Sequence, residues 1–180
     1  MTQPTTRPAA GLTLRPLDHD DPADVEQVAA LIDADPRYVE RVEGRRPRSG
    51  DAEALLRDAP PDLPQEGKVV LGAFDDGVLV AVVDLLRGWP EPGTAHIGLL
   101  QVHAAHQGHG LGRKVHDEAL RWVAVHWPEV VGLRAAIVAP NAARAVPFWR
   151  ALSYRPHGEP VLYTGDHIAT TAQIWVRPLL

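Results

Sequence analysis

The hydrophobic and polar positions of residues 96–127 change period at a glycine-rich loop. Residues 96–102 form an apolar run with Ile, Leu and Val, as in a buried strand. Apolar residues then recur every three or four positions, as on one face of a helix. This stripe comprises Leu111, Val115, Ala119 and Val123, widened by Leu120, Trp122 and Trp127. Because Gly108, Gly110 and Gly112 lie between the two patterns, the sequence predicts a strand, a tight loop and an amphipathic helix.

The rest of the chain alternates between the two periods. Strands are predicted over residues 12–17, 68–74, 77–88, 95–102, 130–139 and 171–177, with a further strand starting at 154–158. Helices are predicted over 18–35, 38–44, 50–59, 111–127 and 141–152. Asp20 or Asp21 is expected to cap the first helix, with Pro22 near its first turn. The pattern indicates an α/β fold with a mixed, mostly antiparallel central sheet flanked by helices.

Composition narrows the class of protein. With 180 residues, 45% of them hydrophobic, the chain is long enough for a substantial core, and we expect a single domain over residues 11–180 behind a flexible arm, residues 1–10. A formal net charge of -5 argues against nucleic acid as the main partner. No cysteine is present, which excludes disulfides and a cysteine nucleophile. Without an apolar leader or membrane-length segment, we expect a cytoplasmic protein and no membrane partner.

Basic side chains gather where the central helix begins. His109, Arg113 and Lys114 lie in its first turn or just before it. A helix N-terminus favours Asp or Glu there, because its first N–H groups lack partners and the macrodipole is positive. A bound polyanion would accept from those N–H groups and pair with the cations. The loop therefore predicts a binding site for an anion of nucleotide size.

Other glycine-loop motifs fit less well. In a dinucleotide-binding fingerprint the third glycine would stand at Arg113, and Gly112 falls one residue early. The phosphate-loop motif is absent because no Gly-Lys-Ser/Thr follows. A purely structural glycine loop stays open as an alternative.

Two segments carry a resemblance to a known family. VHAAHQGHGLG, residues 102–112, is similar to motif A of the GNAT superfamily of acyl-CoA N-acyltransferases, whose signature Q/R-x-x-G-x-G/A is met by Gln107, Gly110 and Gly112. Residues 140–156, PNAARAVPFWRALSYRP, resemble the later motif of that family, in which an Asn opens a helix. With the order of elements, the resemblance covers residues 12–180.

The resemblance implies acetyl-CoA as cosubstrate and no metal. It implies that backbone groups of Leu100, Gln101 and Val102 pair with the pantetheine arm as an added strand would. The diphosphate would lie on the loop and first helical turn, formed by Gln107, Gly108, His109, Gly110, Leu111, Gly112 and Arg113. Asn141 would contact the cofactor near pantetheine, or would simply cap its helix.

Transfer to an amine needs a proton acceptor, because a protonated amine cannot attack a thioester. His96 is the best side-chain candidate, since strict alternation places it on the face of Gly98, Leu100 and Val102, and a histidine on this strand resembles arylalkylamine N-acetyltransferases. A structural histidine at the strand start is the alternative. Asp84, Glu40 and Glu43 are candidates that would act through water.

A tyrosine in the later helix usually protonates the leaving thiolate in the resembling family. Here Trp149 stands at that position, and an indole N–H is not a useful acid. Tyr154 follows in the turn and is a candidate acid, with core packing as its alternative role. Tyr163, or water, is a further candidate. Pro147 predicts either a later helix start or a bulge, since proline costs about 3 kcal/mol inside a helix.

Two clusters have plainer interpretations. His103, His106 and His109 are spaced by three but fall on a strand end, a loop and a turn, so they share no helical face and do not favour a metal site. A basic cluster, Arg45, Arg46 and Arg48, is either a receptor for an acidic substrate or a solvated loop.

The sequence therefore predicts an N-acetyltransferase that moves an acetyl group from acetyl-CoA directly to a primary amine of a small molecule or peptide. No cysteine or Ser-His-Asp motif provides an acyl-enzyme. The alternative is a non-catalytic acyl-CoA-binding sensor or interaction module. Dimers are common in the resembling family, so a homodimer is expected from the resemblance alone.

Overall fold

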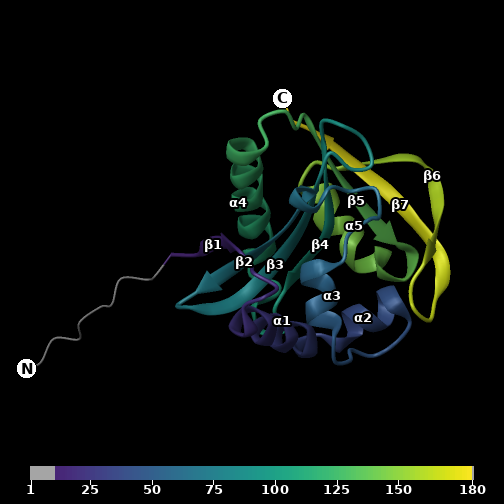
Figure 1. Cartoon of the computed structure of the whole chain (residues 1–180). Coiled ribbons are helices and arrows are strands. Elements are labelled where there is room, and N and C mark those ends of the chain that lie inside the picture. The colour runs from purple at the N-terminus through teal and green to yellow at the C-terminus, as the bar shows by residue number, and fades with distance from the viewer. Residues whose placement is uncertain (1–10, 180) are drawn as a thin grey trace, which may run out of the picture.

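A seven-stranded sheet forms the middle of the molecule in the computed structural model, which describes residues 11–179 (Figure 1). The strands are β1 (Thr13–Pro16), β2 (Lys68–Asp75), β3 (Val78–Arg87), β4 (Thr94–Val102), β5 (Gly132–Val138), β6 (Arg155–Thr164) and β7 (Ala169–Pro178). Their order in the sheet is β1-β2-β3-β4-β5-β7-β6. Among these strands only β4 and β5 pair in parallel. The predicted mixed, mostly antiparallel sheet is confirmed.

Five α-helices flank the sheet in the described part of the chain. They are α1 (Pro22–Ala34), α2 (Pro36–Glu43), α3 (Asp51–Arg57), α4 (Leu111–His126) and α5 (Ala142–Ala151), with short 3-10 turns at η1 (Gln65–Gly67), η2 (Ala104–His106) and η3 (Ala139–Asn141). The predicted cap is confirmed, because the Asp21 side chain accepts from the Ala23 N–H and Pro22 opens α1. The arm predicted for residues 1–10 lies outside the described residues.

Two hydrophobic clusters cover opposite faces of the sheet. The cluster with α4 and α5 includes Leu71, Val83, Val115, Ala119, Val123 and Trp149, and the cluster with α1, α2 and α3 includes Val28, Leu31, Val39, Leu56, Val70 and Val82. Alternate residues of β2 and β3 therefore point to different clusters, as the pleat requires. These two strands are buried on both faces, which explains their almost continuous apolar sequences.

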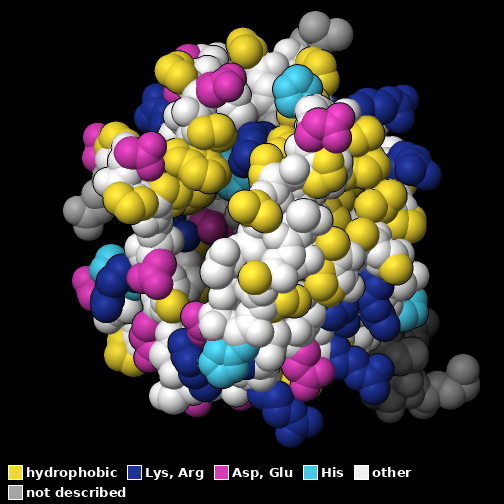
Figure 2. Space-filling model, turned by 90° about the vertical axis from the view of Figure 1, so that its right-hand side faces the viewer, with side chains coloured by type: hydrophobic (Ala, Val, Ile, Leu, Met, Phe, Trp, Pro, Cys, Tyr) yellow, Lys and Arg dark blue, Asp and Glu magenta, His cyan; other side chains and the backbone are white. Residues whose placement is uncertain are grey.

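The β2–β3 hairpin turns at Asp76 and Gly77, whose φ angles are 49° and 80°. Two positive φ angles in a two-residue turn match the right-handed twist of the strands, and this Asp-Gly pair is the signal seen in the sequence. No helix among the described residues is long and apolar enough to cross a bilayer. Figure 2 shows a face on which acidic, basic and hydrophobic side chains are intermingled around a hollow with charged side chains inside it.

Candidate active site

Strand β4 separates from β5 halfway along its length. Its residues 94–97 pair in parallel with β5, from Thr94 opposite Gly132 to Ile97 opposite Ala135, and the pairing ends there. At the same level β4 is bulged against β3, because Leu85 faces Ile97 whereas Asp84 faces Leu99. Residues 99–102 therefore bond to β3 only, and their other edge offers free backbone N–H and C=O groups.

The glycine loop follows the end of this strand. Gly108 and Gly110 have φ angles of 80° and 79°, and a Cβ added at either would meet no atom within 4 Å. Gly110 is the N-cap of α4 and provides no side-chain hydrogen bond to the first turn. The N–H groups that open α4 therefore lack a side-chain acceptor and suit an anion.

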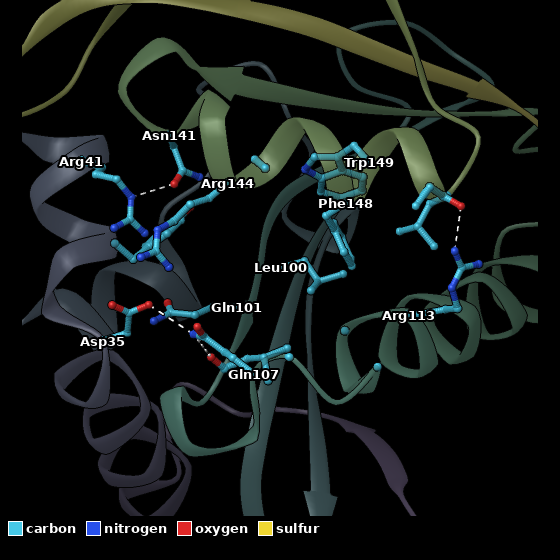
Figure 3. A pocket seen from close by; sticks show the side chains of 18 residues that line it. Asp35, Arg41, Leu100, Gln101, Gln107, Arg113, Asn141, Arg144, Phe148 and Trp149 are labelled. Carbon is cyan, nitrogen blue, oxygen red and sulfur yellow. Dashed lines mark hydrogen bonds between the residues drawn. The ribbon is translucent and has the colours of Figure 1, made fainter.

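A cavity of about 570 Å³ extends from the free edge of β4 to the glycine loop (Figure 3). We refer to it as the first cavity. It is lined by Asp35, Tyr38, Arg41, Leu100, Gln101, Val102, Gln107, Gly108, Gly110, Gly112, Arg113, Asn141, Arg144, Ala145, Phe148, Trp149, Ala151 and Leu152. The structure thus brings together all of the predicted cofactor-binding residues except His109 and Leu111.

His109 and Leu111 line a different hollow, together with Gly11 and Leu12. Their side chains therefore do not line the first cavity. Only the backbone of these two residues remains a candidate for cofactor contact.

Three predicted cofactor residues already have protein partners, and two of them lie on the loop and at the start of α4. Gln107 Nε2 donates to the Val102 carbonyl at 2.9 Å and to Asp35 Oδ2 at 3.2 Å, so its side chain braces the loop. Arg113 donates to the Ala151 carbonyl at 2.7 Å, at the end of α5 (Figure 3). This contact explains part of the basic character at the start of α4 without a ligand.

Asn141, the third, does not act as a side-chain cap of its helix. Its Oδ1 accepts from Arg41 Nε at 2.8 Å instead, which ties α2 to the start of α5. The predicted cap is therefore wrong, while its place in the lining of the first cavity keeps the cofactor contact open.

His96 lies outside the cavities that the other candidates line. Its Nδ1 is 2.9 Å from Arg134 Nη1, and its ring packs edge-on against Trp89 at 5.0 Å. Burial and the Arg134 charge lower the pKa of His96 to about 3, so it would hold an amine's proton poorly. The structure thus gives no support to His96 as base, and the bulge at Gly98 breaks the alternation that placed it on the face of Leu100 and Val102.

Tyr154 is a core residue. It is fully buried, and its hydroxyl lies 3.0 Å from Nε2 of the buried His116, behind the Trp149 ring. Burial raises its pKa, which weakens it as an acid. The structure does not bring Tyr154 to the first cavity, where Trp149 stands instead. Pro147 lies inside α5, which starts at Ala142 and not near the proline.

A second cavity of about 270 Å³ lies on the other side of β4 and shares Tyr38 and Gln101 with the first. We refer to these two residues as the junction. The second cavity is lined by Ile32, Tyr38, Val39, Val42, Glu43, Arg45, Asp51, Ala54, Leu55, Asp84, Gly98, Leu99, Gln101 and Tyr163. Gln101 is 5% exposed, and its Nε2 is buried without a hydrogen-bond partner within the described residues. This amide N–H group at the junction is available to donate to a ligand or to water.

Asp84 provides the buried carboxylate of the second cavity. Its Oδ1 accepts from Lys68 Nζ at 2.7 Å, and both side chains are almost inaccessible to solvent. Burial raises the pKa of Asp84 and the Lys68 charge opposes that rise. The carboxylate fits only because residue 98 is glycine, since a Cβ there would lie 2.5 Å from Asp84 Oδ2.

Glu43 and Tyr163 form the outer wall of the second cavity. The Tyr163 hydroxyl donates to Glu43 Oε1 at 3.2 Å, and the Asp166 N–H donates to Oε2 at 3.0 Å. Burial raises the pKa of Tyr163 to about 12, with the Glu43 charge adding to the effect. Both partners of Glu43 are neutral, so its negative charge stays uncompensated by any cation within 4 Å among the described residues.

The basic cluster is used inside the molecule. Arg45 forms ion pairs with Asp51 at 2.7 Å and with Asp166 at 2.6 Å, and Arg48 reaches Asp166 at 2.7 Å. These bonds fasten the connector after α2 to the β6–β7 turn. Arg46 is exposed and pairs with Glu40 at the surface. The cluster therefore does not form a receptor for an acidic substrate.

Among the residues that line the cavities, sequence reasoning did not single out Tyr38, Arg41 and Arg144, and it missed the Lys68 partner of Asp84. Tyr38 and Arg41 lie one turn apart on α2, a spacing that places them on one helix face. That spacing was visible in the sequence, but it did not indicate which face would meet β4.

The rings of His103 and His106 lie edge-on with their centroids 5.7 Å apart, but no ion-binding cluster found among the described residues includes His103, His106 or His109. Within residues 11–179, the only cluster of three side chains close enough to hold an ion is Asp18, His19 and Asp20 at the surface. His103 Nδ1 accepts from the Ala105 N–H instead.

The model of the Acetyltransferase (GNAT) family matches residues 27–154, most of the chain. The chain belongs to the GNAT family. GNAT acetyltransferases generally transfer an acetyl group from acetyl-CoA. No curated protein sequence matches the chain.

Solved structures share the whole fold of this GNAT protein. An acetyltransferase from Thermus thermophilus is 25% identical, with a TM-score of 0.73, over 95% of this chain and 99% of that one. The ribosomal-protein-S18-alanine N-acetyltransferase of Escherichia coli is 18% identical, with a TM-score of 0.61, over 94% of each chain. A probable acetyltransferase from Staphylococcus epidermidis is 15% identical, with a TM-score of 0.68, over 94% of this chain and all of that one. The two less identical structures show the fold alone.

Proposed function

We propose that this protein is an N-acetyltransferase that transfers the acetyl group of acetyl-CoA directly to a primary amine of a small molecule or peptide. The observation that carries the proposal is the free edge of β4 after Ile97, which faces a cavity that reaches the glycine loop. An extended chain with amide groups, such as pantetheine, would bond to this edge as an added strand. The diphosphate would then meet the first turn of α4.

The residues present fit this cofactor. Gly108 and Gly110 leave open space above the loop, and α4 has neither a side-chain cap nor an acidic residue in its first turn. An anion would therefore meet free N–H groups without repulsion from that turn. Leu100 and Val102 would supply backbone groups for the pantetheine amides, and Phe148 and Trp149 an apolar wall.

Acetyl-CoA would supply the acetyl group as a thioester. The junction, Tyr38 and Gln101, would position the amine, since it is where the two cavities meet. Asp84 would accept the amine's proton through water, because its raised pKa makes it a stronger base than an exposed carboxylate. The C–N bond forms as the C–S bond breaks, and the thiolate takes a proton from solvent, since Tyr154 is buried elsewhere. Asp84 thus replaces His96 as the proposed base.

Calorimetric titration with acetyl-CoA tests the cofactor site. Gly110→Asp and Gly110→Asn have nearly the same shape, and both residues tolerate a left-handed φ, so the pair differs in charge alone. We expect the Asp variant to bind acetyl-CoA at least about tenfold more weakly than the Asn variant, because its carboxylate would repel the diphosphate. Equal affinities would contradict the placement of the diphosphate.

Release of free thiol in the presence of a panel of amines tests the transfer. Turnover with any primary amine, together with formation of the N-acetyl product, supports the proposed N-acetyltransferase function. Acetyl-CoA binding without turnover on every amine would favour the non-catalytic sensor, for which the tryptophan at position 149 is the relevant observation.

A further inference from the structure

Two arginines converge at one end of the first cavity without a carboxylate partner. Arg41 comes from α2 and Arg144 from α5, and Figure 3 shows both side chains on the same side of the cavity. Arg41 donates to Asn141, which lies three residues before Arg144. Neither arginine is within 4 Å of an acidic oxygen among the described residues, and the carboxylate of Asp35 nearby accepts from Gln107 instead. Two like charges at one end of a cavity repel each other, and a bound anion would offset this cost.

The arginine pair lies next to the junction. Tyr38 and Arg41 are three residues apart on α2, so their Cβ atoms are neighbours at roughly 5–6 Å. Arg41 is held toward the cavity by its bond from Nε to Asn141 Oδ1, which leaves the terminal N–H groups of its guanidinium available. An anion bound between the arginines would therefore be close to an amine at the junction.

The second cavity, on the other side of the junction, carries a negative charge where the first carries the two arginines. The second cavity carries the charge of Glu43, which has no cation within 4 Å among the described residues, while its other charged side chains are paired, Arg45 with Asp51 and Asp84 with Lys68. Its apolar lining consists of Ile32, Val39, Val42, Ala54, Leu55 and Leu99. A ligand that spans the junction thus meets cations on one side, and an anion with apolar side chains on the other. This distribution of charge matches a zwitterion with an apolar body.

We propose that the acceptor is an α-amino acid with an apolar side chain. Its carboxylate binds between Arg41 and Arg144, its amine lies at the junction, and its side chain enters the second cavity. The inference rests on the proposed N-acetyltransferase function and names the acceptor class for that site. In the reaction the amine nitrogen gains the acetyl group and loses a proton, and the carboxylate stays unchanged.

Initial rates with L-leucine and L-leucinamide test the proposal, because the amide removes only the negative charge. We expect kcat/KM for leucine to exceed that for leucinamide by about tenfold or more, although the amine of the amide deprotonates more easily. Arg144→Gln should lower kcat/KM for leucine by about tenfold or more and so abolish this preference. Arg144 makes no hydrogen bond or ion pair within residues 11–179, so the variant should fold.

Arg37→Gln is the matched control, since Arg37 is an exposed arginine of α2 outside the cavity lining. It should leave both rates unchanged. Calorimetry of leucine binding to the protein saturated with CoA gives a measure that does not need turnover, and Arg144→Gln should weaken that binding about tenfold or more.

Titrations with acetyl-CoA and with its 3′-dephospho form test whether the two arginines bind a phosphate of the cofactor instead of the carboxylate of the acceptor. If Arg144→Gln weakens acetyl-CoA but not the dephospho form, the arginines bind the cofactor's phosphate and the inference is overturned. Acetylation of leucinamide at a rate equal to or above that of leucine would also overturn it, while leaving the proposed function intact. Failure of acetyl-CoA to bind at all would remove the proposed function itself.

Discussion

Replacement of Lys68 by Met tests the buried charge pair on which the proposed chemistry relies. The substitution keeps the length of the side chain and removes the ammonium group that lies 2.7 Å from Asp84 Oδ1. Both side chains are close to fully buried, at 7% and 12% exposure. Removal of one partner of a buried pair costs about 3–5 kcal/mol, because the other charge remains without water or a counterion. We therefore expect the free energy of unfolding at pH 7.5 to fall by about that amount.

The loss should shrink as the pH falls. Burial already holds the pKa of Asp84 above its usual range, and the loss of Lys68 raises that pKa further. A raised pKa in the folded state means that protonation favours folding, so Lys68→Met regains stability toward low pH. If Asp84 accepts the amine's proton, the acid limb of kcat/KM should move to higher pH in the same variant.

Urea unfolding followed by circular dichroism, and thiol-release rates between pH 5 and 9, measure the two effects. Lys114→Met is the control for stability, since Lys114 is exposed. The double variant Lys68→Met with Asp84→Asn should recover most of the stability and lack the acid limb, because no buried charge remains. A loss below about 1 kcal/mol in Lys68→Met would refute the reasoning, and so would an acid limb that does not move.

Three further predictions concern stability and are measured by urea unfolding. Asp24 is buried and accepts three hydrogen bonds, and the Arg15 guanidinium holds the pKa of Asp24 below its usual value. Asp24→Asn should therefore lower the free energy of unfolding by about 2 kcal/mol at pH 7, and this loss should vanish as the pH falls through the lowered pKa. An equal loss at pH 3 would contradict this prediction. Burial lowers the pKa of His116 to about 4, so the free energy of unfolding should drop by about 1.4 kcal/mol per pH unit as the pH falls from 6.5 toward 4. His116→Gln should flatten this pH dependence. Equal slopes in the two proteins would show that His116 is not its cause. Gly44→Ala should lower the free energy of unfolding more than Gly50→Ala does. Both glycines have positive φ, but only at Gly44 would a Cβ lie 2.8 Å from the His167 carbonyl oxygen. Equal losses would refute the prediction, because they would show that the backbone at His167 moves to accommodate the Cβ.

The elements that the sequence predicted well are those specified by local chemistry. The Asp-Gly turn after β2 and the cap with proline at α1 depend on neighbouring residues alone. The stripe of α4 is set by a period, and Val115, Ala119 and Val123 are indeed buried. The glycine loop was found because positive φ angles demand glycine at Gly108 and Gly110. Half of the residues that line the first cavity were among the cofactor residues expected from the sequence.

The parts that failed depend on packing between distant segments. His96 was misplaced because alternation was counted through Gly98, although an isolated glycine within a strand is itself a sign of a bulge. Arg41 and Tyr38 could not be assigned, because their position depends on how α2 meets η3 and not on any pattern in α2. Asp84 was one of several carboxylates until the partner Lys68, 16 residues earlier, showed which one was buried.

The bulge at Gly98 connects these observations, because one extra residue in β4 has three effects at the same level of the sheet. It shifts the alternation, so that Leu99 and Gln101 face the second cavity while Leu100 and Val102 face only the first. It also bends the strand and increases its twist, and pairing with β5 ends at the preceding residue, Ile97. Since residue 98 has no side chain, the carboxylate of Asp84 can approach the backbone at that point. The free edge and the buried carboxylate therefore share one cause, which places the proposed base beside the strand that would hold the acyl donor.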